Sequence, residues 1–206
     1  MTTGVAAFDF DGTLSTRDNL APFLRAVVGP RALFRAIMLT APHLARAAVD
    51  DERRDIAKVA MLRRVLGGRE YAEIERHGVE FSAEVVRRHL RDDMLARLQW
   101  HREEGHMTVL VSAALGSYLR PVGAALGVDA VLATELAVGD DGRVSGELAG
   151  ANVRRREKVR RLEAWMAREL APDRAVLWAY GDSAGDRELL ARADYPVRIT
   201  RRALLG

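Results

Sequence analysis

Three short apolar runs stand out from a chain whose remaining pattern is largely helical. They cover residues 4–10 (GVAAFDF), 106–113 (HMTVLVSA) and 174–183 (RAVLWAYGDS), and none shows the three-to-four-residue spacing of a helix. Runs of this kind are typical of strands buried in a parallel sheet. Residues 129–138 predict a further strand that continues into a hairpin across the turn GDDG, and YPVRIT (195–200) predicts an edge strand.

Between the first two strands the pattern changes to that of helices. Apolar residues recur every three or four positions in segments 19–28, 30–49, 53–66 and 83–105, with arginines on the other faces. Further helices are expected at 116–127, 154–170 and 186–194. Strands that alternate with helices predict an α/β fold with a Rossmann-like parallel sheet.

The long helical stretch suggests a second unit. Its length exceeds that of a crossover between neighbouring parallel strands, so we interpret it as an insertion. The predicted organisation is an α/β core made of residues 1–16 and 105–206, with an all-helical cap, residues 17–104, inserted after the first strand.

Composition narrows the class of protein. The chain has 206 residues, 49% hydrophobic and 30% charged, which is ordinary for a globular protein. No run approaches the roughly 18 apolar residues of a membrane span, and the N-terminus lacks the basic region of a signal peptide. There is no cysteine, which excludes disulfides and thiolate chemistry. Together these features predict a cytoplasmic protein.

Arginine far outnumbers lysine among the basic residues. Of 32 Lys and Arg residues two are lysine, Lys58 and Lys158, which raises the question of whether these positions need a compact point charge. The arginines are interleaved with acids and are not accompanied by aromatic residues, so we expect a solvated surface and no nucleic-acid partner. Arg54 and Lys58 could bind a substrate anion, but on a charged helix face we expect both to be solvated.

One amphipathic segment leaves two interpretations open. In residues 30–49, Arg31, Arg35 and Arg46 lie beside large apolar residues. The preferred interpretation is a cap helix packed against its neighbours. The alternative is a helix that rests on an anionic membrane surface. No feature of the sequence indicates an oligomeric state.

Candidate chemistry gathers where the strands end. The first strand ends in Asp9-Phe10-Asp11-Gly12-Thr13, the second in Ser112, and the third in Asp182, with Asp186 four residues on. In an open parallel sheet, ligands bind at the carboxyl ends of the strands. Converging carboxylates are costly without a cation, and oxygen ligands suit Mg²⁺. The five histidines are scattered, and His101 and His106 are too poorly spaced for a zinc site.

These motifs resemble those of the haloacid dehalogenase-like hydrolases. DFDGTL, a strand-end Ser112, a downstream Lys158 and GDSAGD follow the order of the four motifs of that family. The position of the cap and the segment from Leu110 to Gly150 are similar to the phosphoserine-phosphatase-like branch with a helical cap. The resemblance covers essentially the whole chain. It implies an HAD-like fold and a Mg²⁺-dependent phosphatase that acts on a small phosphate ester.

The resemblance also implies roles for individual residues. Asp9 is the expected nucleophile, which forms an aspartyl-phosphate, and Asp11 the general acid and base. Ser112, Gly12, Thr13 and Ala113 are expected to bind the phosphoryl group, and Lys158 to supply positive charge, a role that Arg154, Arg155 or Arg156 could fill instead. The expected Mg²⁺ ligands are Asp9, the backbone carbonyl of Asp11 and Asp182, with Asp186 either orienting them or reaching the metal through water.

The substrate is less well specified. Serine-specific members of the family have an acidic residue, typically glutamate, nine residues after the nucleophile, and it holds the amino group of the substrate. This chain has Asp18 there, so Asp18 is expected to bind substrate, although it could equally cap a helix. Their SGG is Ser112-Ala113-Ala114 here, and Gly185 replaces an asparagine before Asp186. These departures weaken the case for free phosphoserine. The alternatives are a phosphotransferase or mutase with the same intermediate, a membrane-associated phosphatase of lipid head groups, and a binding module without activity.

Overall fold

The centre of the molecule is a five-stranded parallel sheet. The computed structural model describes residues 3–47, 51–170 and 175–200, and for 41–47 and 51–54 it describes the backbone alone. The strand order is β3-β2-β1-β6-β7, and each neighbouring pair is parallel. This confirms the predicted α/β class. The bounds are β1 Gly4–Phe8, β2 Met107–Leu115, β3 Ala130–Thr134, β6 Val176–Gly181 and β7 Tyr195–Arg198.

The three strands with the strongest sequence pattern lie side by side at the middle of the sheet. β1 pairs with β2 on one side and with β6 on the other. Because the strands are parallel, the residues that follow each of them meet at one edge, the carboxyl edge. The loops after β1 and β6, which carry the predicted acids, therefore start beside the end of β2, which carries Ser112.

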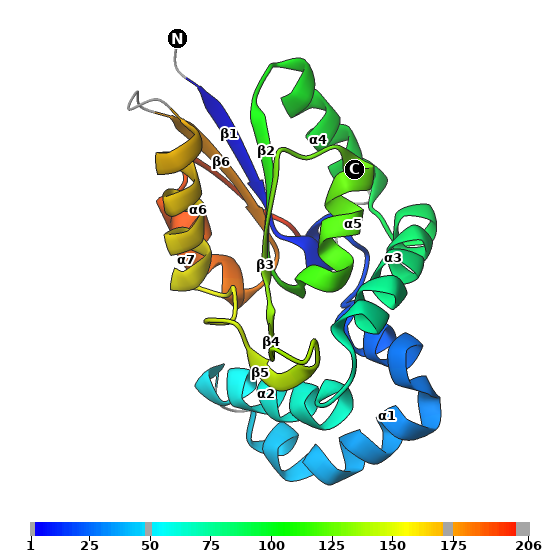
Figure 1. Ribbon diagram of the computed structural model, residues 1–206. Helices are drawn as coiled ribbons and strands as arrows, with labels where there is room; N and C mark the ends of the chain where they lie inside the picture. Colours follow the sequence, from blue (N-terminus) through cyan, green and yellow to red (C-terminus); the bar gives the residue numbers. More distant parts are fainter. Residues whose placement is uncertain (1–2, 48–50, 171–174, 201–206) are drawn as a thin grey trace.

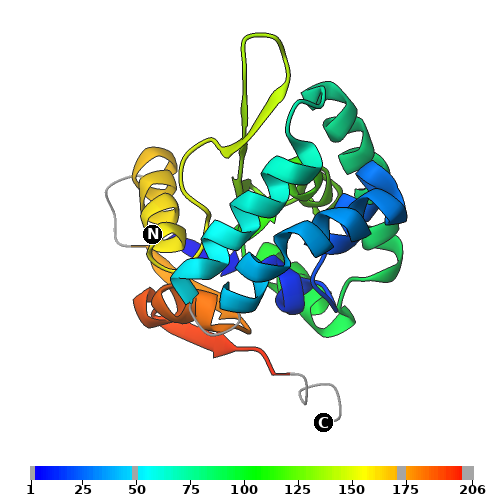
Figure 2. The same cartoon turned by 90° about the horizontal axis from the view of Figure 1, so that it is seen from below.

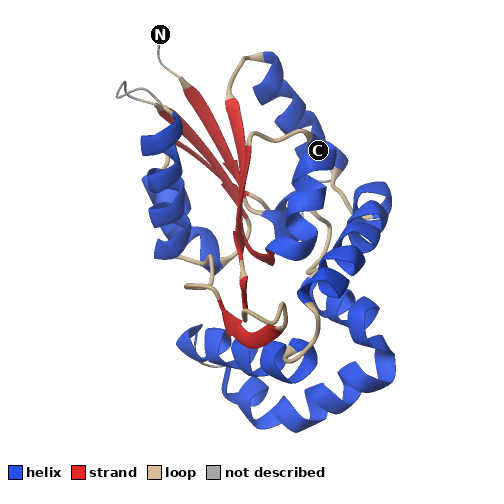
Figure 3. Cartoon of the chain, in the orientation of Figure 1, coloured by secondary structure: helices blue, strands red, loops and turns tan. Residues whose placement is uncertain are grey.

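Helices cover both faces of the sheet (Figures 1 and 3). Alternate residues of β1 point to opposite faces: Val5 and Ala7 pack in one apolar cluster, whereas Ala6 and Phe8 pack in the other. The first cluster includes side chains of α6 (Arg156–Glu169) and α7 (Arg187–Arg192). The second includes side chains of α4 (Asp92–Glu103) and α5 (Gly116–Leu126) and extends beyond the sheet.

Among the residues that the structure describes, four α-helices lie between β1 and β2. They are α1 (Leu20–Ala47), α2 (Asp51–Leu66), α3 (Tyr71–Arg88) and α4. α1 bends at Gly29, where the backbone leaves helical geometry, and α2 ends just before Gly67 and Gly68. We call α1 and α2 the cap helices, because they lie together beyond the carboxyl edge of the sheet (Figures 1 and 2). The division into core and cap domains at the stated residue limits stays a prediction.

A small hairpin accompanies the cap helices. β4 (Leu136–Val138) and β5 (Val144–Leu148) pair antiparallel across the predicted GDDG turn. The hairpin lies beside α2 (Figure 1). Among the residues that the structure describes, none of the helices combines the length and apolar character needed to cross a lipid bilayer.

Candidate active site

A polar cavity opens at the carboxyl edge of the central strands. Its volume is about 670 Å³. The loop after β1, the end of β2, the start of α6 and the loop after β6 all contribute to its wall. The sequence-predicted residues that line it are Asp9, Asp11, Gly12, Asp18, Ser112, Ala113, Lys158, Asp182 and Asp186. The fold therefore gathers nearly all of the predicted site residues around one space.

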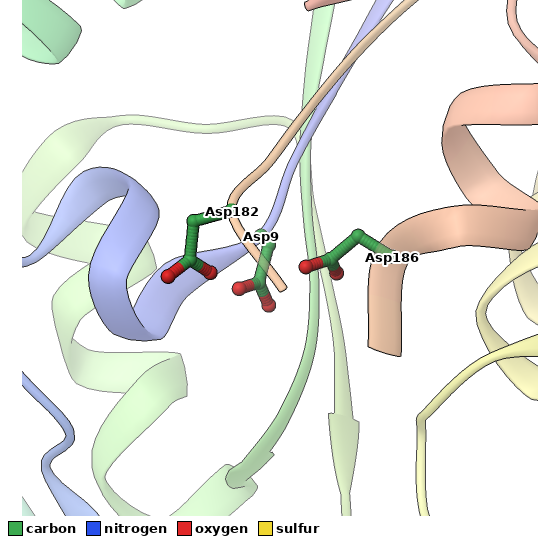
Figure 4. Close-up of side chains that lie close together, drawn as sticks. All are labelled: Asp9, Asp182 and Asp186. Atoms are coloured by element: carbon green, nitrogen blue, oxygen red, sulfur yellow. The ribbon is translucent and has the colours of Figure 1, made fainter. Parts of the chain in front are cut away.

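Three carboxylates converge inside this cavity. Asp9, Asp182 and Asp186 each place an oxygen within 4.8 Å of the other two, and Figure 4 shows their carboxylates turned toward one another. Asp9 and Asp186 are buried and Asp182 is partly exposed. Oxygen donors of this kind fit a hard divalent cation. The geometry therefore provides a site that could hold such an ion.

Lys158 lies between two of the three carboxylates. Its Nζ donates to Oδ1 of Asp9 and to Oδ1 of Asp186, both at 2.5 Å. Burial lowers the pKa of Lys158, but the two carboxylates together raise it by more. The pKa of Lys158 therefore lies above its ordinary value. A buried ammonium paired with two acids is consequently charged at neutral pH. Of the four basic candidates, Lys158 is thus placed directly against Asp9.

Asp186 is held by contacts beyond Lys158. Its Oδ2 accepts from the backbone N–H of Ser183 at 3.0 Å and from the Ser183 hydroxyl at 2.7 Å. The carboxylate thus closes a capping box at the short helical turn Ala184–Asp186. These bonds fix the orientation of Asp186 toward Lys158 and Asp9.

The surroundings of Asp9 include groups that raise its pKa and groups that lower it. Burial raises the pKa of Asp9 to about 6, while the ammonium of Lys158 lowers it and Asp186 raises it. A carboxyl group with this pKa is mainly ionised at neutral pH. The backbone N–H of Asp9 donates to the carbonyl of Tyr180 at 2.9 Å, which connects the end of β1 to β6. Asp9 is therefore a rigidly held carboxylate.

Asp11 has a different environment from Asp9. Its Oδ1 accepts from Asn19 twice, from Nδ2 at 2.7 Å and from the backbone N–H at 3.1 Å. Burial and then the nearby Asp18 raise the pKa of Asp11 to about 8, although the Asn19 bonds lower it. At neutral pH Asp11 is consequently protonated for the most part, while Asp9 is mainly ionised. Two acids two residues apart are thus suited to two different roles.

Gly12 allows the loop after β1 to lie close to the carboxylate of Asp182. Its φ is +79°, and a Cβ at this position would lie 2.3 Å from Oδ2 of Asp182. A side chain would therefore suffer both backbone strain and a collision. Ser112, which also lines the cavity, is buried, and its Oγ accepts from the backbone N–H of Ala114 at 3.3 Å. The hydroxyl hydrogen of Ser112 is left for another acceptor.

Two predicted phosphoryl- or substrate-binding residues are placed differently from the rest. Thr13 is fully buried and does not line the cavity, and its Oγ1 has no hydrogen-bond partner among the described residues. Asp18 lines the cavity at its exposed rim, and its Oδ1 accepts from the backbone N–H of Leu20 at 3.0 Å. Asp18 therefore makes the capping contact that the alternative interpretation predicted.

The expectation of a solvated Lys58 was wrong. Its Nζ donates to the carbonyl of Ala113 at 2.5 Å and to Oδ1 of Asn152 at 2.6 Å, and burial lowers its pKa to about 8. Helical periodicity places Lys58 on a charged face of α2, but it cannot show that this face meets the end of β2. The side chain of Arg54 lies outside the described residues.

Several residues in or beside the cavity were missed by sequence reasoning. Asn19 is fully buried and holds Asp11, and Arg91 is buried, lines the cavity and forms an ion pair with Asp93 at 2.9 Å. An asparagine before a helix is an ordinary capping signal, so its sequence context does not reveal a side chain that serves Asp11. Arg17, Arg154 and Arg198 complete the basic lining.

Comparisons with known proteins agree with this geometry. A model of the haloacid dehalogenase-like hydrolase family matches residues 6–191. The protein CicA of Caulobacter vibrioides is 40% identical over 191 residues, 92% of this chain and 83% of CicA. The histidinol-phosphatase of Neisseria meningitidis serogroup C is 30% identical over 138 residues, 66% of this chain and 61% of that protein.

Solved structures share the fold. A protein of unknown function from Bordetella pertussis has a TM-score of 0.69 and 30% identity, over 93% of this chain and 87% of that one. A phosphoserine phosphatase, solved as an analogue of its phospho-aspartyl intermediate, has a TM-score of 0.64 and 17% identity, over 94% of this chain and 84% of that one. With the family match across the sheet and the cavity, this chain belongs to the haloacid dehalogenase-like hydrolases.

Proposed function

We propose that this hydrolase is a Mg²⁺-dependent phosphomonoesterase that acts on a small phosphorylated metabolite through an aspartyl-phosphate. The observation that carries the proposal is the pair Asp9 and Asp11. One is a mainly ionised carboxylate against Lys158, and the other, held by Asn19, has a pKa raised to about 8. A nucleophile and a separate proton donor are what hydrolysis in two steps requires.

The proposed first step forms the covalent intermediate. A carboxylate oxygen of Asp9 attacks phosphorus, and the bond between phosphorus and the ester oxygen breaks. The proton of Asp11 passes to the departing oxygen, which leaves as an alcohol. In the second step water attacks the aspartyl-phosphate, Asp11 takes up a proton from that water, and phosphate is released as Asp9 is regenerated.

Charge in the cavity supports the same reaction. Lys158 offsets the charge of Asp9 and Asp186 and supplies a positive group beside the site of attack. Asp9, Asp182 and the backbone carbonyl of Asp11 would hold Mg²⁺, with Asp186 orienting that set. When bound, the ion supplies positive charge to the transferring phosphoryl group. Ser112 would donate its hydroxyl hydrogen to a phosphoryl oxygen.

The test is phosphate release from a panel of phosphomonoesters with Mg²⁺ or with EDTA. The panel contains phosphoserine, histidinol phosphate, sugar and polyol phosphates, and nucleotides. Wild type is expected to turn over at least one ester in Mg²⁺ and none in EDTA, and Asp9→Asn is expected to be inactive. Asp141→Asn, in the exposed hairpin turn, is the matched control and should retain activity. Equal activity in wild type and Asp9→Asn would contradict the proposal.

One observation favours a second candidate, a phosphatase that acts at a lipid surface. The second half of α1 has apolar residues on two sides, of which Leu33 and Ala36 are buried. On the other side Phe34 is 62% exposed, Met38 54% and Leu39 59%. Ile56 of α2 is 60% exposed, and Arg31 and Arg35 flank Phe34. An apolar helix face flanked by arginines is suited to an anionic membrane.

Vesicle binding separates the two candidates. Wild type would be sedimented with vesicles of phosphatidylglycerol and phosphatidylcholine, and with phosphatidylcholine alone. The second candidate predicts binding to the anionic vesicles that Phe34→Ser reduces, together with turnover of a lipid head-group phosphate ester. Absence of binding at low ionic strength would remove it and leave the soluble-metabolite proposal untouched.

A further inference from the structure

Lys58 crosses from a cap helix to the end of a central strand. It lies on α2, whereas both of its hydrogen-bond partners, Ala113 and Asn152, lie outside the cap helices. The contacts are 2.5 Å and 2.6 Å long, as expected of bonds from a charged donor. Ordering a long lysine side chain costs conformational entropy, so two such contacts indicate a defined position.

The partner of Lys58 is itself held in place. Oδ1 of Asn152 also accepts from the Thr134 hydroxyl at 2.9 Å, and its Nδ2 donates to Asp55 at 2.6 Å. The Thr134 hydroxyl in turn accepts from the backbone N–H of Val153 at 3.0 Å. The network joins α2 to β3 and to the loop before α6. Lys58 is therefore directed at Ala113 by groups that do not belong to the catalytic set.

The bond to Ala113 acts on the peptide unit next to Ser112. The carbonyl of Ala113 and the N–H of Ala114 belong to one planar peptide unit, in which they point in opposite directions. Lys58 binds the carbonyl, and the N–H on the other side donates to Oγ of Ser112 at 3.3 Å. Rotation of this peptide unit would break both bonds together.

We propose that Lys58 is a positioning residue that orients the Ser112 hydroxyl by fixing the peptide unit between Ala113 and Ala114. A serine oxygen that accepts from this N–H keeps its own hydrogen for a phosphoryl oxygen. The cap helix would thus contribute to the phosphoryl-binding end of the cavity, and not solely to the part that surrounds the rest of the substrate. This inference rests on the proposed function, because Ser112 is assigned to the phosphoryl group there.

A double-mutant cycle tests the proposal. The variants are Lys58→Met, Ser112→Ala and the double variant, and the probe is inorganic phosphate in the presence of Mg²⁺. Its Kd is taken from the rise in melting temperature with phosphate concentration. Lys58→Met is expected to weaken phosphate binding by about 10-fold in the wild-type background, and by less than about 2-fold when Ser112 is already alanine, since coupled residues are not additive. The same non-additivity is expected in kcat/KM for the best ester.

Other roles of Lys58 predict other results. If Lys58 acts through its charge alone, its replacement weakens phosphate binding equally in both backgrounds. If it contacts the leaving group alone, phosphate binding does not change, because phosphate has no leaving group. Either result would overturn the proposal. Arg64→Met removes a positive charge from an exposed position of the same helix and is the control for a general electrostatic effect, with unchanged phosphate binding expected.

Two other failures, a variant that does not fold and a wild type that is not a phosphatase, can be distinguished from failure of this proposal. If Lys58→Met does not fold, Lys58→Gln takes its place in the cycle, since glutamine is uncharged and shorter than lysine. Additive effects of Lys58→Gln and Ser112→Ala would then overturn the proposal. A wild type that binds phosphate but hydrolyses no ester would contradict the proposed phosphatase, whereas the phosphate-binding cycle would still decide the role of Lys58.

Discussion

At the scale of single residues, two separate features of the structure require glycine at position 12. Its φ of +79° disfavours any side chain, and its missing Cβ leaves room for the carboxylate of Asp182. Gly12→Ala is expected to lower the free energy of unfolding by about 1–2 kcal/mol through the backbone and to reduce phosphatase activity strongly through the collision. Urea denaturation and ester hydrolysis measure the two effects.

Gly105 offers a matched control for Gly12. Its φ is +71°, and a Cβ there would meet no atom within 4 Å. Gly105→Ala is expected to show the same backbone cost while its activity, corrected for folded protein, stays at the wild-type level. Similar losses of activity in both variants would contradict the assigned contact between Gly12 and Asp182.

Lys158 allows the charge of the site to be tested without turnover. It separates Asp9 from Asp186, so Lys158→Met leaves two buried carboxylates without their shared cation. Loss of one partner of a buried ion pair costs about 3–5 kcal/mol, and we expect a loss of this size in EDTA. Mg²⁺ should raise the melting temperature of Lys158→Met more than that of wild type.

The exposed Arg168 is the control for Lys158. It pairs with Glu169 on the surface of α6, and Arg168→Met should change stability by less than about 1 kcal/mol. A melting temperature of Lys158→Met that does not respond to Mg²⁺ would contradict the assignment of the three carboxylates to a cation.

How far the site could be predicted differs from residue to residue. Asp9, Ser112, Asp182 and Lys158 follow from motif order and strand ends, and the structure gathers them around one cavity. Lys58 could not be placed correctly, because its partners lie 55 and 94 positions away in the chain. Contacts of that kind depend on how elements pack, and helical periodicity carries no information on which distant carbonyl a lysine meets.

At the scale of elements, His101 fastens α4 to the sheet. It is fully buried, its Nε2 lies 2.8 Å from the hydroxyl of Tyr180, and its Nδ1 lies 2.8 Å from Nδ1 of His106. Burial, together with His106 and Arg97, lowers the pKa of His101 to about 4. The folded state therefore favours the neutral ring.

The sign of the pH effect follows from this depressed pKa. In the unfolded chain His101 takes up a proton as the pH falls below about 6.5, whereas in the folded chain it does so near 4. Its contribution to stability is complete above about 6.5 and is lost as the pH falls toward 4. His101→Gln should therefore flatten the pH dependence of the urea midpoint between these values, relative to wild type.

Asp9, whose pKa is about 6, titrates in the same range, so the prediction concerns the difference between variant and wild type. His77→Gln is the control, because His77 is partly exposed on α3 beside Glu73 and Glu80. An equally steep pH dependence in His101→Gln and wild type would contradict the role given to His101.

At the scale of the whole molecule, the sequence predicted the sheet better than the cap. Strands β1, β2 and β6 are short apolar runs between turn signals, and these local features suffice to place them. Helices were also expected between β1 and β2, but the first part of α3 lay in no predicted segment, and the single helix expected at 83–105 is interrupted between α3 and α4. The faces of these helices are decided by partners elsewhere in the chain, however, so the pattern alone could not decide whether residues such as Phe34 and Met38 are packed or exposed.

Cap helices and sheet share one apolar cluster. It contains Phe8 of β1, Phe23 and Leu24 of α1, and Leu62 and Leu66 of α2. Side chains that belong to one closely packed cluster are expected to lose their contacts together. The molecule should therefore unfold in a single transition, although the cap helices extend beyond the sheet.

Leu62→Ala, a variant in α2, tests this expectation. The three tryptophans whose fluorescence is followed lie outside the cap helices, in α4, α6 and β6. Leu62 is fully buried, so its truncation should cost about 2–5 kcal/mol. If cap and sheet unfold together, the midpoint from tryptophan fluorescence falls as much as that from far-ultraviolet circular dichroism. A midpoint that falls in circular dichroism alone would mean that the cap helices unfold independently. Leu39→Ala, at an exposed position of α1, should move neither signal by more than about 0.5 kcal/mol.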